Sequence, residues 1–171
     1  MLKLQKLIDI FFSDINILEE AFTHHSICEK KQSNKCICYR RFEIFGDSLI
    51  NFEIVKFLYN KNKYYNRNEI SNYKQQLQSN KNLINIGKKL ELSQYLRYDE
   101  NVPYKITLDT INANLLESLC CVIYIDKGED IAKDFIYKHI CSQEIKYKNT
   151  NNDPKTKLNE YFIKNFNIFP S

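Results

Sequence analysis

The chain contains few of the residues that interrupt helices. Its 171 residues include only three glycines and three prolines: Gly46, Gly87, Gly128, Pro103, Pro154 and Pro170. Sheet proteins with many turns need both residue types, so their scarcity disfavours that class and favours long helices. The sequence therefore predicts an all-α fold, and its length suits one well-buried domain with a short appendage.

Two further features are missing. The chain has no apolar run of about 18 residues, which a membrane-spanning helix requires, and no N-terminal secretory leader. We therefore expect a soluble, cytoplasmic protein with no membrane partner. Six cysteines in such a protein indicate a reducing compartment. Cys120, Cys121 and Cys141 lie in apolar surroundings and are expected to be small core residues.

A group of histidines and cysteines near the N-terminus allows two interpretations. It consists of His24, His25, Cys28, Cys36 and Cys38. Zinc uses such ligands, but this spacing matches no familiar zinc motif. Adjacent residues on a helix point about 100° apart, so at most one of the two histidines faces any given site. A cysteine-containing loop beside a hydrogen-bonded structural histidine is the favoured interpretation, with zinc as the alternative.

The net charge of +4, from 25 basic and 21 acidic residues, says little about function by itself. Basic residues cluster at 30–41, 61–67 and 146–157. Such clusters suit a phosphate backbone, but they are also common as solubilising charge. The richness in Asn, Lys, Ile and Tyr is typical of an A/T-biased coding sequence, so the lysines carry little weight here.

Two acids stand out in the apolar, helix-forming segment 40–51. Glu43 and Asp47 are four residues apart, which on a helix stacks their carboxylates on one face with Cβ atoms about 5 to 6 Å apart. Their repulsion is tolerated when water screens both acids or when a cation lies between them, and Mg²⁺ prefers such oxygen ligands. Gly46, costly inside a helix, indicates a close approach by another part of the chain.

A second apolar segment, 112–126, also carries oxygen-bearing side chains. Asn114 and Glu117 are one helical turn apart and therefore share a face. A carboxylate among Leu, Cys, Val and Ile pays a large desolvation cost unless it is paired or bound to a metal. The two segments together favour a metal site over solvated surface charge.

Helix start and stop signals divide the rest of the chain. Ser13 or Asp14, Asn68 and Ser79 are the expected N-caps, and Gly128 is an expected stop. The segments predicted to be helical share apolar residues at helical spacing: 2–12, 14–22, 40–59, 68–77, 80–90, 107–126, 129–140 and a last helix from Asp153. The segments expected to be irregular are polar: 27–39, 60–67, 99–106 and 142–153.

The two acidic segments resemble the conserved motifs of a known family. Residues 41–49 (RFEIFGDSL) resemble the signature helix of the ribonuclease III family, and residues 113–118 (ANLLES) resemble its second acidic motif. The resemblance extends to 23–26 (THHS), to 70–80 and to 124–128 (YIDKG). It covers residues 2–141 in unbroken order, so a chance match is excluded in practice.

The resemblance implies a fold and a division of the chain. Residues 1–141 would form a ribonuclease III endonuclease-domain fold. Residues 142–171 are similar to a linker and the first helix of a double-stranded-RNA-binding domain, which would be truncated here. Members of the family are homodimers that cut double-stranded RNA with Mg²⁺, so the chain is expected to bind that RNA, to pair with a second copy and to act in ribosomal and messenger RNA processing.

The resemblance also implies roles for individual residues. Glu43, Asn114 and Glu117 stand at the metal-ligand positions, and Asp47 and Glu117 at the catalytic positions, where Asp47 would position metal or water. Ile44 stands where the family has an apolar residue that docks into the partner subunit.

Three positions depart from the family pattern. Arg40, Arg67 and Asn114 stand where acids are expected, and an asparagine contributes an oxygen but no charge. Slow catalysis, or catalysis that needs high magnesium, follows from these departures. The alternative is an RNA-binding or ribosome-associated protein of the same fold that has lost cutting, since arginine binds phosphate instead of metal. A helical interaction module with mere surface acids is the third interpretation.

Overall fold

The computed structural model of the chain describes residues 1–31, 36–101 and 108–142, and its elements there are helical. The helices are α1 (Leu2–Ile8), α2 (Ile15–Ala21), α3 (His25–Lys31), α4 (Tyr39–Lys61), α5 (Arg67–Leu77), α6 (Asn80–Lys89), the 3₁₀ turn η1 (Leu92–Tyr95), α7 (Leu108–Lys127), α8 (Glu129–Ile136) and the π-helical turn η2 (Tyr137–Cys141). Within these ranges the β-type pairing is an isolated bridge between Thr23 and Arg97. The predicted all-α fold is confirmed.

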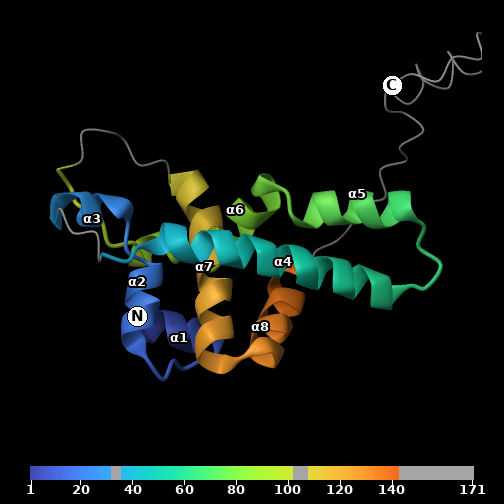
Figure 1. The fold of residues 1–171 in the computed structure, drawn as a ribbon, viewed down its shortest axis with the longest axis horizontal. Coiled ribbons are helices and arrows are strands. Elements are labelled where there is room, and N and C mark those ends of the chain that lie inside the picture. Colours follow the sequence, from blue (N-terminus) through green and yellow to red (C-terminus); the bar gives the residue numbers. More distant parts are fainter. Residues whose placement is uncertain (32–35, 102–107, 143–171) are drawn as a thin grey trace, which may run out of the picture.

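The two helices that carry the acidic motifs cross at the centre of the molecule. α4 runs along the long axis, α7 crosses it, and α5 returns alongside the second half of α4 (Figure 1). α6 and α8 pack against α7 on either side of the crossing. Most of α7 is buried by these neighbours, with Leu115, Leu116 and Leu119 fully inaccessible to solvent. The core is therefore built around the helix that holds Asn114 and Glu117.

Two of the three predicted helix N-caps are confirmed. Asp14 and Ser79 cap α2 and α6 through their side chains, as predicted. α5 begins earlier than predicted, because Asn66 and not Asn68 is its cap. The Asn66 side chain accepts the backbone N–H of Glu69, and the Glu69 carboxylate accepts the N–H of Asn66. This capping box satisfies two donors at once, which Asn68 could not do.

The predicted loop at 27–39 is wrong in its first part, where α3 forms. The chain after α2 is extended, since the backbone N–H of His24 donates to the carbonyl of Arg97 (2.7 Å) and the N–H of Tyr39 donates to that of Thr23 (2.9 Å). These pairings end α2 at Ala21 and let α3 begin at His25. Both partners are distant in sequence, so local patterning did not indicate them.

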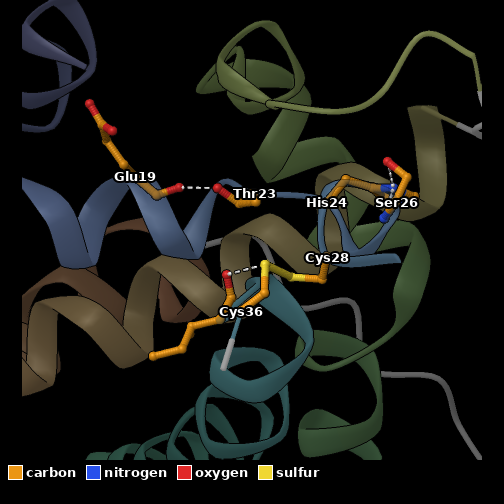
Figure 2. Close-up of a disulfide and its surroundings, with 7 residues drawn as sticks. Glu19, Thr23, His24, Ser26, Cys28 and Cys36 are labelled. Carbon is orange, nitrogen blue, oxygen red and sulfur yellow. Dashed lines mark hydrogen bonds between the residues drawn. A yellow bond between two sulfur atoms is a disulfide. The ribbon is translucent and has the colours of Figure 1, made fainter. Parts of the chain in front are cut away.

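A disulfide joins α3 to the segment that precedes α4. Cys28 and Cys36 are bonded, with their Cα atoms 5.2 Å apart (Figure 2). The expectation of a reducing compartment did not anticipate this bond, and it removes two of the five residues of the suggested zinc group. Cys120, Cys121 and Cys141 are buried free thiols, as predicted for core residues.

Gly87 marks a close approach of two helices, and Gly128 marks the expected stop. A Cβ added to Gly87 of α6 would lie 2.4 Å from the carbonyl oxygen of Asn112 in α7, so this pair of helices packs backbone to backbone. Gly128 has a φ of +87° and separates α7 from α8, which confirms the predicted stop. α8 and η2 together account for the helix predicted over 129–140.

Two further predictions concern the C-terminal segment and the absence of a membrane-spanning helix. The linker and the last helix, over 142–171, lie outside the described residues except for Ser142. In the portion that is described, none of the helices has the length and apolar character that crossing a bilayer demands.

Candidate functional site

Gly46 brings the two acidic helices into backbone contact. A Cβ at this position would lie only 1.9 Å from the carbonyl oxygen of Glu117 and 2.5 Å from its carbonyl carbon. Any side chain here would drive α4 away from α7. The absence of one therefore allows Glu43 and Asp47, which flank Gly46 on α4, to approach Glu117 on α7.

The three acids share one electrostatic neighbourhood. Burial, together with the charges of Asp47 and Glu43, raises the pKa of Glu117 from 4.5 to about 8. Burial also raises the pKa of Glu43, where Arg40 opposes the shift and Asp47 adds to it. Like charges raise each other's pKa only when they are close, so the helix crossing brings Glu117 near Glu43 and Asp47. A cation among them would relieve the repulsion.

Amide side chains from α4 and from the end of α5 bind Asp47. Asn51 donates its Nδ2 to Oδ1 of Asp47 at 3.3 Å, and Gln78 donates its Nε2 to the same oxygen at 3.5 Å. These contacts leave the other carboxylate oxygen available. Neither amide was predicted from the sequence. Asn51 is one turn beyond Asp47 and could have been found by helical spacing, whereas Gln78 is 31 residues away and gives no local signal.

Arg40 lies at the other end of the same face of α4. Its Nη2 donates to Nε2 of His25 on α3 at 3.3 Å, so His25 accepts and its ring is neutral. Burial and the neighbouring Arg40 lower the pKa of His25 in agreement with this state. The positive charge of Arg40 thus stands one turn before Glu43, at a position where the family resemblance implied an acid.

His24 is the structural histidine that the sequence favoured. It is buried, and its Nδ1 accepts the backbone N–H of Ser26 at 3.2 Å and lies 3.0 Å from the Ser26 hydroxyl (Figure 2). Burial, with the charges of His25 and Arg40, lowers the pKa of His24 to about 4. The ring is therefore neutral near neutral pH and serves the turn into α3.

The remaining predicted residues lie at different distances from the acids. Asn114 is half-buried on α7, one turn before Glu117, so helical spacing places it on the same face. Arg67 is the first residue of α5 and Gln78 follows its last, so Arg67 lies about 16 Å along that helix, at roughly 1.5 Å per residue, from Gln78, the residue of this segment that contacts Asp47. Ile44 is 74% exposed on α4. Arg67 is thus not part of the acidic neighbourhood.

The donors fit a hard divalent ion by their chemistry. All are oxygens, three from carboxylates and one from the Asn114 amide. A cation would offset both the burial and the like charges that raise the pKa values of Glu117 and Glu43. Within residues 1–31, 36–101 and 108–142, however, no three Asp, Glu, His or Cys side chains are arranged as a metal-binding group. The metal and catalytic roles of Glu43, Asp47, Asn114 and Glu117 stay predictions.

Relatives of known name match nearly the whole chain. The Ribonuclease 3 of Leptospira interrogans is 34% identical over 174 aligned residues, which cover 98% of this chain and 69% of that protein. The Ribonuclease 3 of Mycoplasmopsis synoviae is 31% identical over 157 residues, covering 90% of this chain and 67% of that protein.

Solved structures match the fold. The crystal structure of the nuclease domain of ribonuclease III from Campylobacter jejuni superimposes with a TM-score of 0.71 at 22% identity, covering 85% of this chain and 98% of that one. A second structure of that domain, described for flexibility in a region involved in dimer formation, gives a TM-score of 0.68 at 22% identity and covers 81% of this chain and 97% of that one. The fold is therefore that of the ribonuclease III nuclease domain.

The sequence model of a family described as Ribonuclease-III-like matches residues 14–144, a span that contains α2 to η2 and with them both acidic helices. Since this match covers most of the chain, the protein belongs to the ribonuclease III family of endoribonucleases.

Proposed function

We propose that the protein hydrolyses phosphodiester bonds in double-stranded RNA with Mg²⁺ as its metal, in the maturation of ribosomal and messenger RNA in the cytoplasm. The observation that carries the proposal is the backbone contact between Gly46 and Glu117, which brings Glu117 on α7 near Asp47 and Glu43 on α4. Burial and two neighbouring acids hold Glu117 protonated near neutral pH, an arrangement that costs stability when the carboxyl ionises. The arrangement is well suited to a site where a cation and a phosphate meet.

The residues would divide the work by position. Glu43 and Glu117 would hold the metal from two helices, with Asn114 adding a neutral oxygen, and a bound Mg²⁺ would supply Lewis acidity toward the phosphate and its attacking water. Asp47, oriented by Asn51 and Gln78, would hold its free oxygen toward the reacting groups. A-form RNA would be recognised through its shape, its phosphates and its 2′-hydroxyls.

A second copy of the chain would cover an apolar face of α4. The exposed apolar residues there and on the adjacent part of α7 are Ile44, Phe45, Phe52, Val55, Tyr59 and Ile125. Four of them, at 45, 52, 55 and 59, recur at helical spacing and so lie along one side of α4. Such a stripe suits a homodimer interface, which is consistent with the dimer-forming region named for the Campylobacter jejuni domain.

The division of the chain also forms part of the proposal. Residues 1–141 would be the nuclease domain, and residues 142–171 the linker and first helix of a double-stranded-RNA-binding domain.

The alternative is an RNA-binding or ribosome-associated protein with little or no cutting. The neutral Asn114 and the lack of a preformed three-ligand group among the described residues favour it. In that case the fold would still bind duplex RNA, but the acids would not assemble around a metal.

Cleavage of a long duplex RNA separates the two functions. We expect short products with Mg²⁺, none with a chelator, and none from Glu117→Gln, which keeps the side-chain shape but cannot ionise to bind a metal. Glu129→Gln, an exposed change on α8, is the matched control and should cut normally. Duplex binding without products at high Mg²⁺ would refute catalysis and support the alternative.

A further inference from the structure

Arg40 presents a guanidinium that is anchored on one side and exposed. The Nη2 group donates to Nε2 of His25 at 3.3 Å, and the side chain is otherwise at the surface near the start of α4. A guanidinium has five N–H donors in one plane, and the bond to His25 occupies one of them. The anchor fixes the direction of the group and leaves donors for a ligand.

The charge of Arg40 is not neutralised by direct contact. In the part of the chain that the structure describes, no carboxylate forms an ion pair with Arg40, whereas Arg97 pairs with Glu19 at 2.7 Å. His25, the residue that holds Arg40, is neutral. The charge of Arg40 lowers the pKa of Glu43, but burial raises it by more, so the pKa stays above its ordinary value.

Arg40 shares a face of α4 with the proposed catalytic residues. Residues 40, 43, 47 and 51 follow one another at intervals of three and four, so they form a single stripe along the helix. Arg40 and Asp47 are about 10 Å apart along the axis at roughly 1.5 Å per residue. A phosphate bound at Arg40 would therefore lie about 10 Å along the helix axis from one bound at the acids.

We propose that Arg40 is a phosphate-binding residue of this protein, positioned by His25, that holds the RNA backbone beside the acidic stripe. The proposal rests on the proposed function in requiring RNA as the ligand, but it does not require cutting. Arginine binds phosphate through two parallel hydrogen bonds, and an acid at this position would repel the RNA. The site would thus have the positive charge of Arg40 at one end and the acids proposed to bind the metal at the other.

Binding of a short duplex RNA in a chelator tests this directly, since no metal is present and nothing is cut. We expect Arg40→Gln to weaken binding about tenfold or more, the typical loss for a charge-assisted contact. It should also reduce the slope of log affinity against log salt by about 1. Arg41→Gln is the matched control: Arg41 is also exposed on α4 but points about 100° away. Arg41→Gln should weaken binding by less than tenfold and reduce the salt slope by less than 1.

His25 is tested as the positioning residue by a double-mutant cycle. His25→Ala should weaken binding when Arg40 is present and should have no further effect in the Arg40→Gln background. Arg40→Lys should restore the salt slope but only part of the affinity, because it keeps the charge and loses the planar fork. Additive effects of the two substitutions would overturn the role of His25.

The outcomes distinguish this proposal from the proposed function. Equal binding by wild type and Arg40→Gln, or equal weakening by Arg40→Gln and Arg41→Gln, would overturn the Arg40 proposal even if the wild type cuts RNA. Weaker binding by Arg40→Gln alone would support it even if the wild type never cuts. Thermal unfolding of each variant confirms that the exposed substitutions leave the fold intact.

Discussion

The crossing of α4 and α7 at Gly46 makes Gly46→Ala the most informative single substitution. To bring the new Cβ from 1.9 Å to the 3.4 Å at which ordinary contact begins, the helices must separate by about 1.5 Å. The clash is with backbone, so no side chain can move aside. Overpacking costs about 1–3 kcal/mol, and alanine returns about 1 kcal/mol of helix propensity. Because a whole buried helix must shift, we expect a net loss near the upper end, about 2 kcal/mol.

The same shift should weaken the coupling of the acids. With α7 displaced, Asp47 and Glu43 lie farther from Glu117 and water reaches it more easily, so the pKa of Glu117 should fall from about 8 toward its ordinary value. Chemical denaturation measures the stability, and NMR titration of carboxyl-labelled glutamate measures the pKa.

Gly87→Ala is the matched control for this experiment. Its Cβ would meet the backbone of Asn112 at 2.4 Å, so it also forces a helix away from α7. That helix is α6 and not α4, and the contact lies about 7.5 Å along α7 from Glu117. It should destabilise the protein and leave the pKa of Glu117 unchanged. A Gly46→Ala protein as stable as the wild type, or one with the pKa of Glu117 unaltered, would refute the close crossing.

Three further predictions concern other parts of the molecule. Because His24 takes up a proton below pH 6.5 when unfolded but only below about 4 when folded, its contribution to stability should fall by about 2 kcal/mol from pH 7.5 to 5, whereas the raised pKa of Glu117 acts in the opposite direction over that range. Urea unfolding measures the His24 contribution as the difference between the wild type and His24→Asn, and the same pH dependence in both proteins would contradict the assignment. Replacing Cys28 and Cys36 by serine should cost about 2.5 kcal/mol from chain entropy in thermal or urea unfolding, while Cys38→Ser should cost less than 1 kcal/mol. Ile44→Asp should convert a dimer into a monomer in analytical ultracentrifugation, whereas Ile131→Asp on α8 should not; equal behaviour would place the interface elsewhere.

What the sequence predicted was mainly local. The spacing of Glu43 and Asp47, the glycine between them, and the turn that separates Asn114 from Glu117 are all properties of single helices, so their faces could be assigned before the structure was known. The start of α5 was also readable, since Asn66 and Glu69 have the spacing of a capping box.

What the sequence did not predict depends on partners far along the chain. α3 forms because Arg97 and Tyr39 fix the backbone on either side of it, and Gln78 reaches Asp47 only because α5 runs back beside α4. The bond between Cys28 and Cys36 likewise depends on how α3 lies against the start of α4. The anchoring of Arg40 by His25 arises in the same way, so the sequence could suggest an unusual arginine but not its contact.

The central claim is that Glu43, Asp47 and Glu117 act together on a divalent ion, and Mn²⁺ binding observed by electron paramagnetic resonance tests it most directly. The account predicts that the wild-type protein binds Mn²⁺, that Mg²⁺ displaces it, and that Glu117→Gln abolishes tight binding while Glu129→Gln leaves it unchanged. Equal Mn²⁺ binding by wild type and Glu117→Gln, or no binding by either, would contradict it.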